Sequence, residues 1–184
     1  MLLDHRDCHL LVIDMQERLL PAMADADATL RNALSLVTAA RYFNVPVTFS
    51  EQYPRGIGHT LPALLDAAGP DGRVFEKLEF SCAGNTALKA HIAELRRAGR
   101  KQLLLCGVEA HVCVLQSAVG FADNGHGVAV AVDATSSRSL FSRDMMLARL
   151  ARSVIMPVTT EMVIFEWLGQ AGTPDFKALL PLIK

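Results

Sequence analysis

The segment "LLLCGVEAHVCVLQSA", residues 103–118, joins a strand pattern directly to a helix pattern. Its first part is an apolar run that ends at Gly107, which is typical of a strand buried on both faces. A short loop with Glu109 and His111 follows, and Cys113 then begins residues that can open a helix. A strand that leads into a helix is the repeating unit of parallel α/β proteins.

The rest of the chain repeats this alternation. The expected strands lie at 8–14, 45–52, 73–77, 101–108, 126–134 and 153–157, and the expected helices at 26–43, 85–99, 113–125, 142–153 and 159–169. Neighbouring strands are too far apart for hairpins, so they require crossovers and a parallel sheet. The sequence predicts a doubly wound, three-layer α/β/α fold with a mostly parallel sheet of about six strands, in a single domain spanning 1–184. The one long irregular stretch, 51–72, is rich in Gly and Pro, and such loops are often functional.

Composition narrows the class of protein. Hydrophobic residues make up 51% of the 184 residues and charged residues 20%, which favours a packed globule over disorder. A formal net charge of −1 gives no basic surface for nucleic acid or for an anionic membrane. The first residues show no signal-peptide pattern, and no apolar run reaches the roughly 18 residues that span a bilayer. We therefore expect a cytoplasmic protein without nucleic-acid or membrane partners.

Three side chains stand where strands end or a helix begins, namely Asp14, Lys77 and Cys113. Ligands of doubly wound folds bind at the carboxyl ends of the strands, and we expect the first, third and fourth strands to be adjacent, so these residues should converge there. A helix start and a nearby Lys77 would lower the pKa of the Cys113 thiol below its usual value of about 8.5. Each residue also has an ordinary interpretation: a core cysteine, a strand-end carboxylate that caps a turn, and a surface lysine.

The other three cysteines are expected to pack. Cys8 and Cys106 lie in strand patterns, and Cys82 lies in the loop after Lys77. None of the four has the spacing of a zinc site or of a C-x-x-C pair, and we expect them to remain reduced thiols.

Three segments together resemble a known family. "LLVIDMQERLLPAM" at 10–23, "FEKLEFSCAGN" at 75–85 and the opening segment are similar, in order and spacing, to the signature segments of the isochorismatase-like cysteine hydrolases. "EQYPRGIGHTLPAL" at 51–64 and "VDATSSRS" at 132–139 resemble one subgroup of isochorismatase-domain hydrolases. The resemblance spans most of the chain.

The resemblance implies a catalytic triad of Asp14, Lys77 and Cys113, with Cys113 as the nucleophile. It also implies a cis peptide bond between Val108 and Glu109, and an oxyanion hole formed by the backbone N–H groups of Glu109 and Cys113. The loop in the opening segment would then place a thiol and two donors around one carbonyl carbon.

The surroundings of the triad are expected to hold a small molecule without a cofactor or metal. Nicotinamidases of this superfamily carry an Asp and two His as zinc ligands after the second strand, whereas this chain offers only Glu51 and His59 there. Two ligands are too few for a catalytic zinc, so we expect none. The neighbourhood of the motifs suggests a substrate pocket lined by Gln52, Tyr53, Ile57, Phe80 and His111, with loop or core packing as the alternative.

The function predicted from these features is hydrolysis of a small amide or related C–N bond through a thioester on Cys113. One alternative is a cysteine-independent hydrolase of vinyl ethers, the reaction that names the family. Another is a non-catalytic oligomeric interaction module. A nucleotide-dependent oxidoreductase ranks last, because "DMQERL" at 14–19 stands where a G-x-G-x-x-G motif would be needed.

We also expect a homo-oligomer, a dimer or larger, because the last third of the chain carries much apolar surface. Ile164, Phe165 and Trp167 are the residues expected near the subunit contact, with the chain's own core as the competing interpretation.

Overall fold

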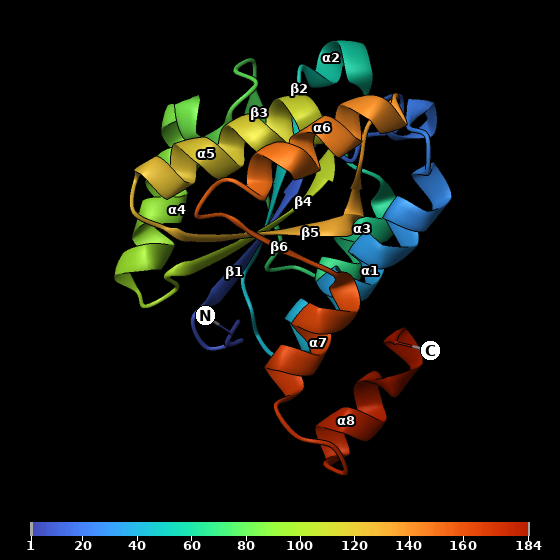
Figure 1. The fold of residues 1–184 in the computed structure, drawn as a ribbon, viewed down its shortest axis with the longest axis vertical. Coiled ribbons are helices and arrows are strands. Elements are labelled where there is room, and N and C mark those ends of the chain that lie inside the picture. Colours follow the sequence, from blue (N-terminus) through green and yellow to red (C-terminus); the bar gives the residue numbers. More distant parts are fainter. Residues whose placement is uncertain (1, 184) are drawn as a thin grey trace.

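The computed structural model describes residues 2–183 and contains one sheet of six parallel strands, in the order β3-β2-β1-β4-β5-β6 (Figure 1). The strands are β1 (Cys8–Ile13), β2 (Val47–Gln52), β3 (Arg73–Lys77), β4 (Gln102–Val108), β5 (Gly127–Ser136) and β6 (Met156–Val158). The predicted fold class is confirmed, and β3 has the predicted bounds.

Helices cover both faces of this sheet (Figure 1). They are α1 (Ala26–Tyr42), α2 (Pro54–Ile57), α3 (Pro62–Ala68), α4 (Thr86–Arg97), α5 (Leu115–Asp123), α6 (Leu140–Leu150), α7 (Thr160–Leu168) and α8 (Pro174–Leu179). Because successive strand residues point to opposite faces, Leu10 of β1 packs with α1, α3 and α7, whereas Leu11 packs with α4, α5 and α6. The central strands are buried on both sides, which explains their uninterrupted apolar runs.

A close approach between β1 and β4 depends on Gly107. This glycine lies opposite Ile13 in the ladder and has a φ of +117°. A Cβ at this position would lie 2.0 Å from the carbonyl oxygen of Ile13, so no other residue fits without moving one of the strands. The ends of β1 and β4 are thereby held together at the edge where Asp14 and Glu109 follow.

Two expectations about connections are corrected. The stretch 51–72, expected to be irregular after its first residues, carries the short helices α2 and α3. Strands one, three and four were expected to be neighbours, but β2 lies between β1 and β3. Lys77 must therefore reach past the end of β2 to meet Asp14.

The expected subunit contact on α7 is wrong for two of its three residues. Ile164 and Trp167 are buried in the chain's own core, which is the competing interpretation. Phe165 is 44% exposed, and its ring lies 6.3 Å from that of Phe176. Of the three expected residues, only Phe165 lies at the surface, where it could contact another copy.

Candidate active site

Asp14 lies directly after β1 and is fully buried. Its backbone adopts the left-handed conformation with φ of 52°, a region that Asp enters more readily than most residues. Its Oδ1 accepts a hydrogen bond of 2.7 Å from the Ser50 hydroxyl, and its Oδ2 lies 2.7 Å from Nζ of Lys77. Burial raises the pKa of the Asp14 carboxyl, with the charge and hydrogen bond of Lys77 opposing this effect.

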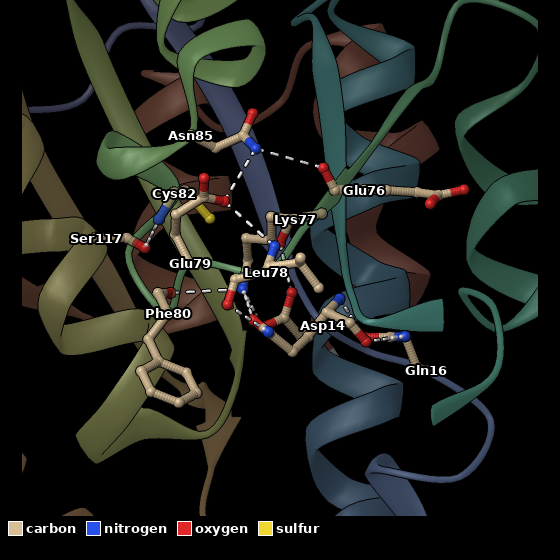
Figure 2. A network of polar contacts seen from close by, with 12 residues as sticks. Asp14, Gln16, Glu76, Lys77, Leu78, Glu79, Phe80, Cys82, Asn85 and Ser117 are labelled. Carbon is tan, nitrogen blue, oxygen red and sulfur yellow. Dashed lines mark hydrogen bonds and ion pairs between the residues drawn. The ribbon is translucent and has the colours of Figure 1, made fainter. Parts of the chain in front are cut away.

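Lys77 ends β3 and is buried with Asp14, and Figure 2 shows the two side chains pointing toward one another. Burial alone would lower the pKa of the Lys77 ammonium, but Asp14 and the thiols of Cys82 and Cys113 raise it overall. The lysine therefore keeps its proton, and burial makes the ionised form of Asp14 a stronger base than usual. Such a carboxylate is suited to accept a proton from a neighbouring group.

The loop after β3 is shaped by local hydrogen bonds (Figure 2). The Asn85 amide donates to the Glu79 carboxylate at 3.1 Å, and its oxygen accepts from the N–H of Leu88 to cap α4. The Glu79 carboxylate also accepts from the N–H of Leu78 at 3.2 Å. These bonds hold the turn that returns the backbone carbonyl of Phe80 to within 3.4 Å of Nζ of Lys77.

Cys113 lies in a π-helical turn, Ala110–Val114, which precedes α5. Both Asp14 and Lys77 are close enough to act on its thiol. The expected low pKa of the Cys113 thiol is wrong for the site without substrate. Burial is the main cause that raises this pKa to about 12, and the charge of Asp14 adds to it, while Lys77 has the opposite, lowering effect. The sequence could not show this burial, and the residue lies within the helical turn rather than at an exposed helix start. Deprotonation of this thiol therefore needs a base beside it.

The other three thiols are fully buried, as expected. Burial raises the pKa of Cys8 and Cys106 to about 12 and that of Cys82 to about 11. Cys113 is 6% exposed, so it is the only one of the four with access to solvent. Cys82 lies close enough to Lys77 and Asp14 for their charges to act on it, a proximity that its place in the loop only hinted at.

The Val108–Glu109 peptide bond is cis, as the resemblance implied. Within residues 2–183, the N–H of Glu109 has no hydrogen-bond acceptor. The Glu109 side chain turns to Arg138, whose backbone N–H donates to Oε2 at 3.1 Å and whose guanidinium lies 3.2 Å from Oε1. Burial raises the pKa of the Glu109 carboxyl, but the bonds from Arg138 lower it overall. Arg138 thus holds the Glu109 carboxylate, while the N–H of Glu109 has no acceptor within residues 2–183.

Two of the five expected pocket residues lie beside Lys77. A cleft of about 410 Å³ is lined by Lys77 and Tyr53 together with Pro54, Arg55, Glu76, Leu78, Glu79 and Asn85. Tyr53 is half exposed and has a left-handed backbone with φ of 40°. The side-chain amide of Gln52 instead forms hydrogen bonds within the protein. Its Oε1 accepts from Lys77 at 2.6 Å, and its Nε2 donates to the Leu78 carbonyl at 2.9 Å. Gln52 is therefore a hydrogen-bond partner of Lys77.

Tyr53 is the one expected pocket residue that lines this cleft; Gln52, Ile57, Phe80 and His111 do not. The ring of Phe80 turns away from the Lys77 network (Figure 2) and is exposed. His111 forms a hydrogen bond of 2.9 Å with the Ser137 hydroxyl, and Ile57 ends the short helix α2. Phe80 contacts Lys77 only through its backbone carbonyl oxygen, which accepts a hydrogen bond from Nζ of Lys77.

Glu51 and His59, the two residues weighed as zinc ligands, bind each other. Nδ1 of His59 lies 3.0 Å from Oε2 of Glu51, and the N–H of Thr60 donates to Oε1. Within the part of the chain that the structure describes, no three His, Cys, Asp or Glu side chains form a cluster that could hold a metal ion. The carboxylate ties the loop before α3 to the end of β2, and the absence of a cofactor stays a prediction.

Three residues that the sequence did not single out support the site. Ser50 orients Asp14, Arg138 holds Glu109, and the buried Gln16 joins loops: its Nε2 donates to the carbonyls of Gln52 and Gly58. Ser50 lies two residues before Gln52 on β2, so the period of a strand was the one available signal for it. Arg138 and Gln16 carried no signal in a single sequence.

With this geometry in view, known proteins that resemble the chain can be compared. The sequence matches the isochorismatase domain family over residues 8–162. The chain belongs to the isochorismatase family. It is 35% identical over 178 residues to "Secreted isochorismatase effector Isc1" of Phytophthora sojae, covering 95% of this chain and 83% of that protein. It is therefore an isochorismatase-family hydrolase.

Solved structures of family members superpose closely on the chain. The "MAR1 Ribonuclease" of Caenorhabditis elegans has a TM-score of 0.91 and 30% identity, covering 100% of this chain and 92% of that one. YcaC of Pseudomonas aeruginosa, solved with hexane-2,5-diol and covalent acrylamide, has a TM-score of 0.88 and 25% identity, covering 98% and 91%. YcaC of Escherichia coli, described as an octameric hydrolase of unknown specificity, has a TM-score of 0.85 and 25% identity, covering 98% and 95%.

These relatives bear on the expected location. No helix within residues 2–183 is long and apolar enough to cross a membrane. The Phytophthora relative is named as secreted, so family membership does not fix a compartment. The cytoplasmic location stays a prediction.

Proposed function

We propose that the chain is a cysteine hydrolase that cleaves a small amide or related C–N bond through a thioester on Cys113. One observation carries the proposal: the buried Asp14–Lys77 pair, at 2.7 Å, stands beside the one thiol with access to solvent. A buried ion pair is costly to desolvate, and nothing in the packing of β1 against β4 requires one. Its position next to Cys113 supports a chemical role.

In the proposed first step, Asp14 accepts the proton of the Cys113 thiol as the sulfur attacks the substrate carbonyl carbon. A carboxylate with a raised pKa is a stronger base, and the thiol in turn needs one. Lys77 stays protonated, balances the negative charge and keeps Asp14 in place. The C–S bond forms while the carbonyl oxygen becomes an oxyanion.

The backbone N–H groups of Glu109 and Cys113 are proposed to stabilise that oxyanion. The N–H of Glu109 has no acceptor within residues 2–183. A donor of an oxyanion hole must be free in this way before substrate binds. When the intermediate collapses, the C–N bond breaks, and the proton held by Asp14 goes to the leaving nitrogen. Water, deprotonated by Asp14, then attacks the thioester and releases a carboxylic acid and the thiol.

The covalent acrylamide on the Pseudomonas YcaC supports this proposal. Acrylamide is an electrophile that thiols trap, and it carries a small amide group. Its capture by a structure with a TM-score of 0.88 to this chain fits a reactive nucleophile and a small pocket. Vinyl-ether hydrolysis without a cysteine would leave the Cys113 thiol beside Asp14 and Lys77 without a use.

The decisive experiment is a screen of small amides, ureides and carbamoyl compounds for released ammonia. The parent chain is expected to turn over at least one of them, and intact-protein mass spectrometry of the quenched reaction should show a transient acyl adduct on Cys113. Turnover of vinyl ethers alone, with no adduct, would overturn the proposal.

A further inference from the structure

The Lys77 ammonium has three N–H donors, and the structure provides one acceptor for each. Nζ lies 2.7 Å from Oδ2 of Asp14, 2.6 Å from Oε1 of Gln52 and 3.4 Å from the carbonyl oxygen of Phe80. A lysine side chain otherwise keeps much rotational freedom, so three acceptors fix its charge in one place. Gln52 is the only one of these acceptors that is neither a proposed catalytic side chain nor backbone.

The amide of Gln52 is itself fixed at both ends. Its Nε2 donates to the carbonyl of Leu78 at 2.9 Å, which decides that the oxygen faces Lys77. Its backbone N–H donates to Oε1 of Gln16 at 2.8 Å, and Nε2 of Gln16 donates back to the Gln52 carbonyl at 3.0 Å. The amide oxygen therefore cannot turn away from Lys77 without also breaking the hydrogen bond from Nε2 to the Leu78 carbonyl.

We propose that Gln52 is a positioning residue, whose amide oxygen holds the Lys77 ammonium against Asp14 and so sets how strongly that charge acts on the Cys113 thiol. This inference rests on the proposed function, because it takes Cys113 as the reacting group. It replaces the expectation that Gln52 contacts substrate, since both ends of its amide are already bonded to the protein.

The titratable and charged groups that face Lys77 come from several elements. They are Asp14 after β1, Cys82 and Glu79 in the loop after β3, and Cys113 in the π-helical turn. Gln52, at the end of β2, is neutral. Charge can thus be changed at position 52 while the other groups around Lys77 stay the same.

Two substitutions change that charge in opposite directions. Gln52→Met removes the partial negative charge of the amide oxygen at similar length, whereas Gln52→Glu replaces it with a full negative charge. A negative charge beside Lys77 offsets its attraction for a thiolate, so the pKa of the Cys113 thiol should rise in the order Met, Gln, Glu at position 52. A thiol titrating above the working pH reacts through its small thiolate fraction, so each pKa unit changes the rate tenfold.

The test is the rate at which iodoacetamide labels Cys113 at about pH 8.5, with the labelled site read by peptide mass spectrometry. We expect Gln52→Glu to be about tenfold slower than the parent and Gln52→Met to be several-fold faster. Gln170→Glu and Gln170→Met make the same changes at an exposed residue after α7, and they should leave the rate unchanged.

Equal rates for the two Gln52 variants, or a change in the same direction, in folded proteins would overturn the inference and leave Gln52 a structural residue. The proposed function fails in a different way, because the parent itself would then label at a cysteine other than Cys113. Melting curves followed by circular dichroism establish that each variant is folded.

Discussion

At the scale of single residues, the proposed site combines the Asp14 carboxylate, the Lys77 ammonium and the Cys113 thiol. The thiol cannot lose its proton at neutral pH without a base beside it. The pKa of Cys113 is raised to about 12 by burial, so a preformed thiolate is not available at neutral pH. The proposed chemistry therefore depends on Asp14 taking the proton at the moment of attack, rather than on a standing thiolate beside Lys77.

The first prediction concerns the nucleophile. Cys113→Ser is expected to keep the parent's melting curve and to lose hydrolysis, because the serine hydroxyl is a weaker nucleophile and acid than the thiol in the same place. Ammonia release and thermal unfolding measure the two properties. Cys106→Ala is the matched control: it removes a fully buried thiol of β4 and should lower stability while activity remains. Parent-like turnover by Cys113→Ser would point to the cysteine-independent reaction instead.

The second prediction concerns the buried ion pair. Lys77→Met leaves the Asp14 carboxylate buried without its partner, so the free energy of unfolding should fall by about 3–5 kcal/mol. Asp14→Asn combined with Lys77→Met removes both charges and should regain much of that loss, although it stays inactive. Urea unfolding of the parent, single and double variants checks this. A double variant no more stable than Lys77→Met would show that the charges are not coupled.

At the scale of elements, the pattern of a strand leading into a helix was sufficient for β3 at its bounds and for the order of the six strands and five of the helices, but α2, α3 and α8 were not expected. The order of the strands within the sheet could not be predicted, because nothing in the sequence around Lys77 shows that β2 lies between β3 and β1. Apolar residues on every side of α7 likewise could not say that Trp167 faces the core while Phe165 faces outward. The raised pKa of Cys113 depends on tertiary burial, which no local pattern carries.

The third prediction tests the contact between β1 and β4. Gly107→Ala places a Cβ 2.0 Å from the Ile13 carbonyl oxygen at a φ of +117°, and it should cost more than about 3 kcal/mol of stability. Gly99→Ala is the matched control, since Gly99 has a φ of +105° with nothing within 4 Å of its added Cβ. That variant should lose only about 1–2 kcal/mol in urea unfolding. Equal losses would show that φ alone, and not the close approach, makes the glycine necessary.

The fourth prediction concerns pH and His9 of β1, which is buried and forms a hydrogen bond of 2.9 Å with Thr48 of β2. Burial lowers its pKa from 6.5 to about 3. Between these values the unfolded chain binds a proton that the folded chain does not, so the free energy of unfolding falls as the pH drops through this window. From pH 7 to pH 5 this residue should account for about 2 kcal/mol.

His9→Gln keeps a hydrogen-bonding side chain but does not titrate. Its stability should therefore depend less on pH than the parent's in urea unfolding at the two pH values. Parallel losses in the parent and the variant would assign the acid sensitivity to other groups.

At the scale of the whole molecule, several large apolar side chains remain at the surface. Phe141 is 74% exposed and Val154 is 87% exposed, and the Escherichia YcaC relative is described as octameric. We predict that the chain also forms a homo-oligomer, since apolar surface of this kind favours contact between copies. Light scattering should report a multiple of the 20.0 kDa chain mass. A single-chain mass at micromolar concentration would contradict this.

The order of strands in the sheet divides the chain into two contiguous halves. The first supplies β1, β2 and β3, the second supplies β4, β5 and β6, and among residues 2–183 the only ladder between the halves joins β1 to β4. Asp14 and Lys77 belong to the first half and Cys113 to the second, so neither half holds all three groups of the proposed mechanism. On the proposed function, a chain still emerging from the ribosome would therefore be inactive until β4 has docked. If the chain were cut between α4 and β4, the two fragments would regain the proposed hydrolysis only by reassociating. Activity would then report the association of the two fragments.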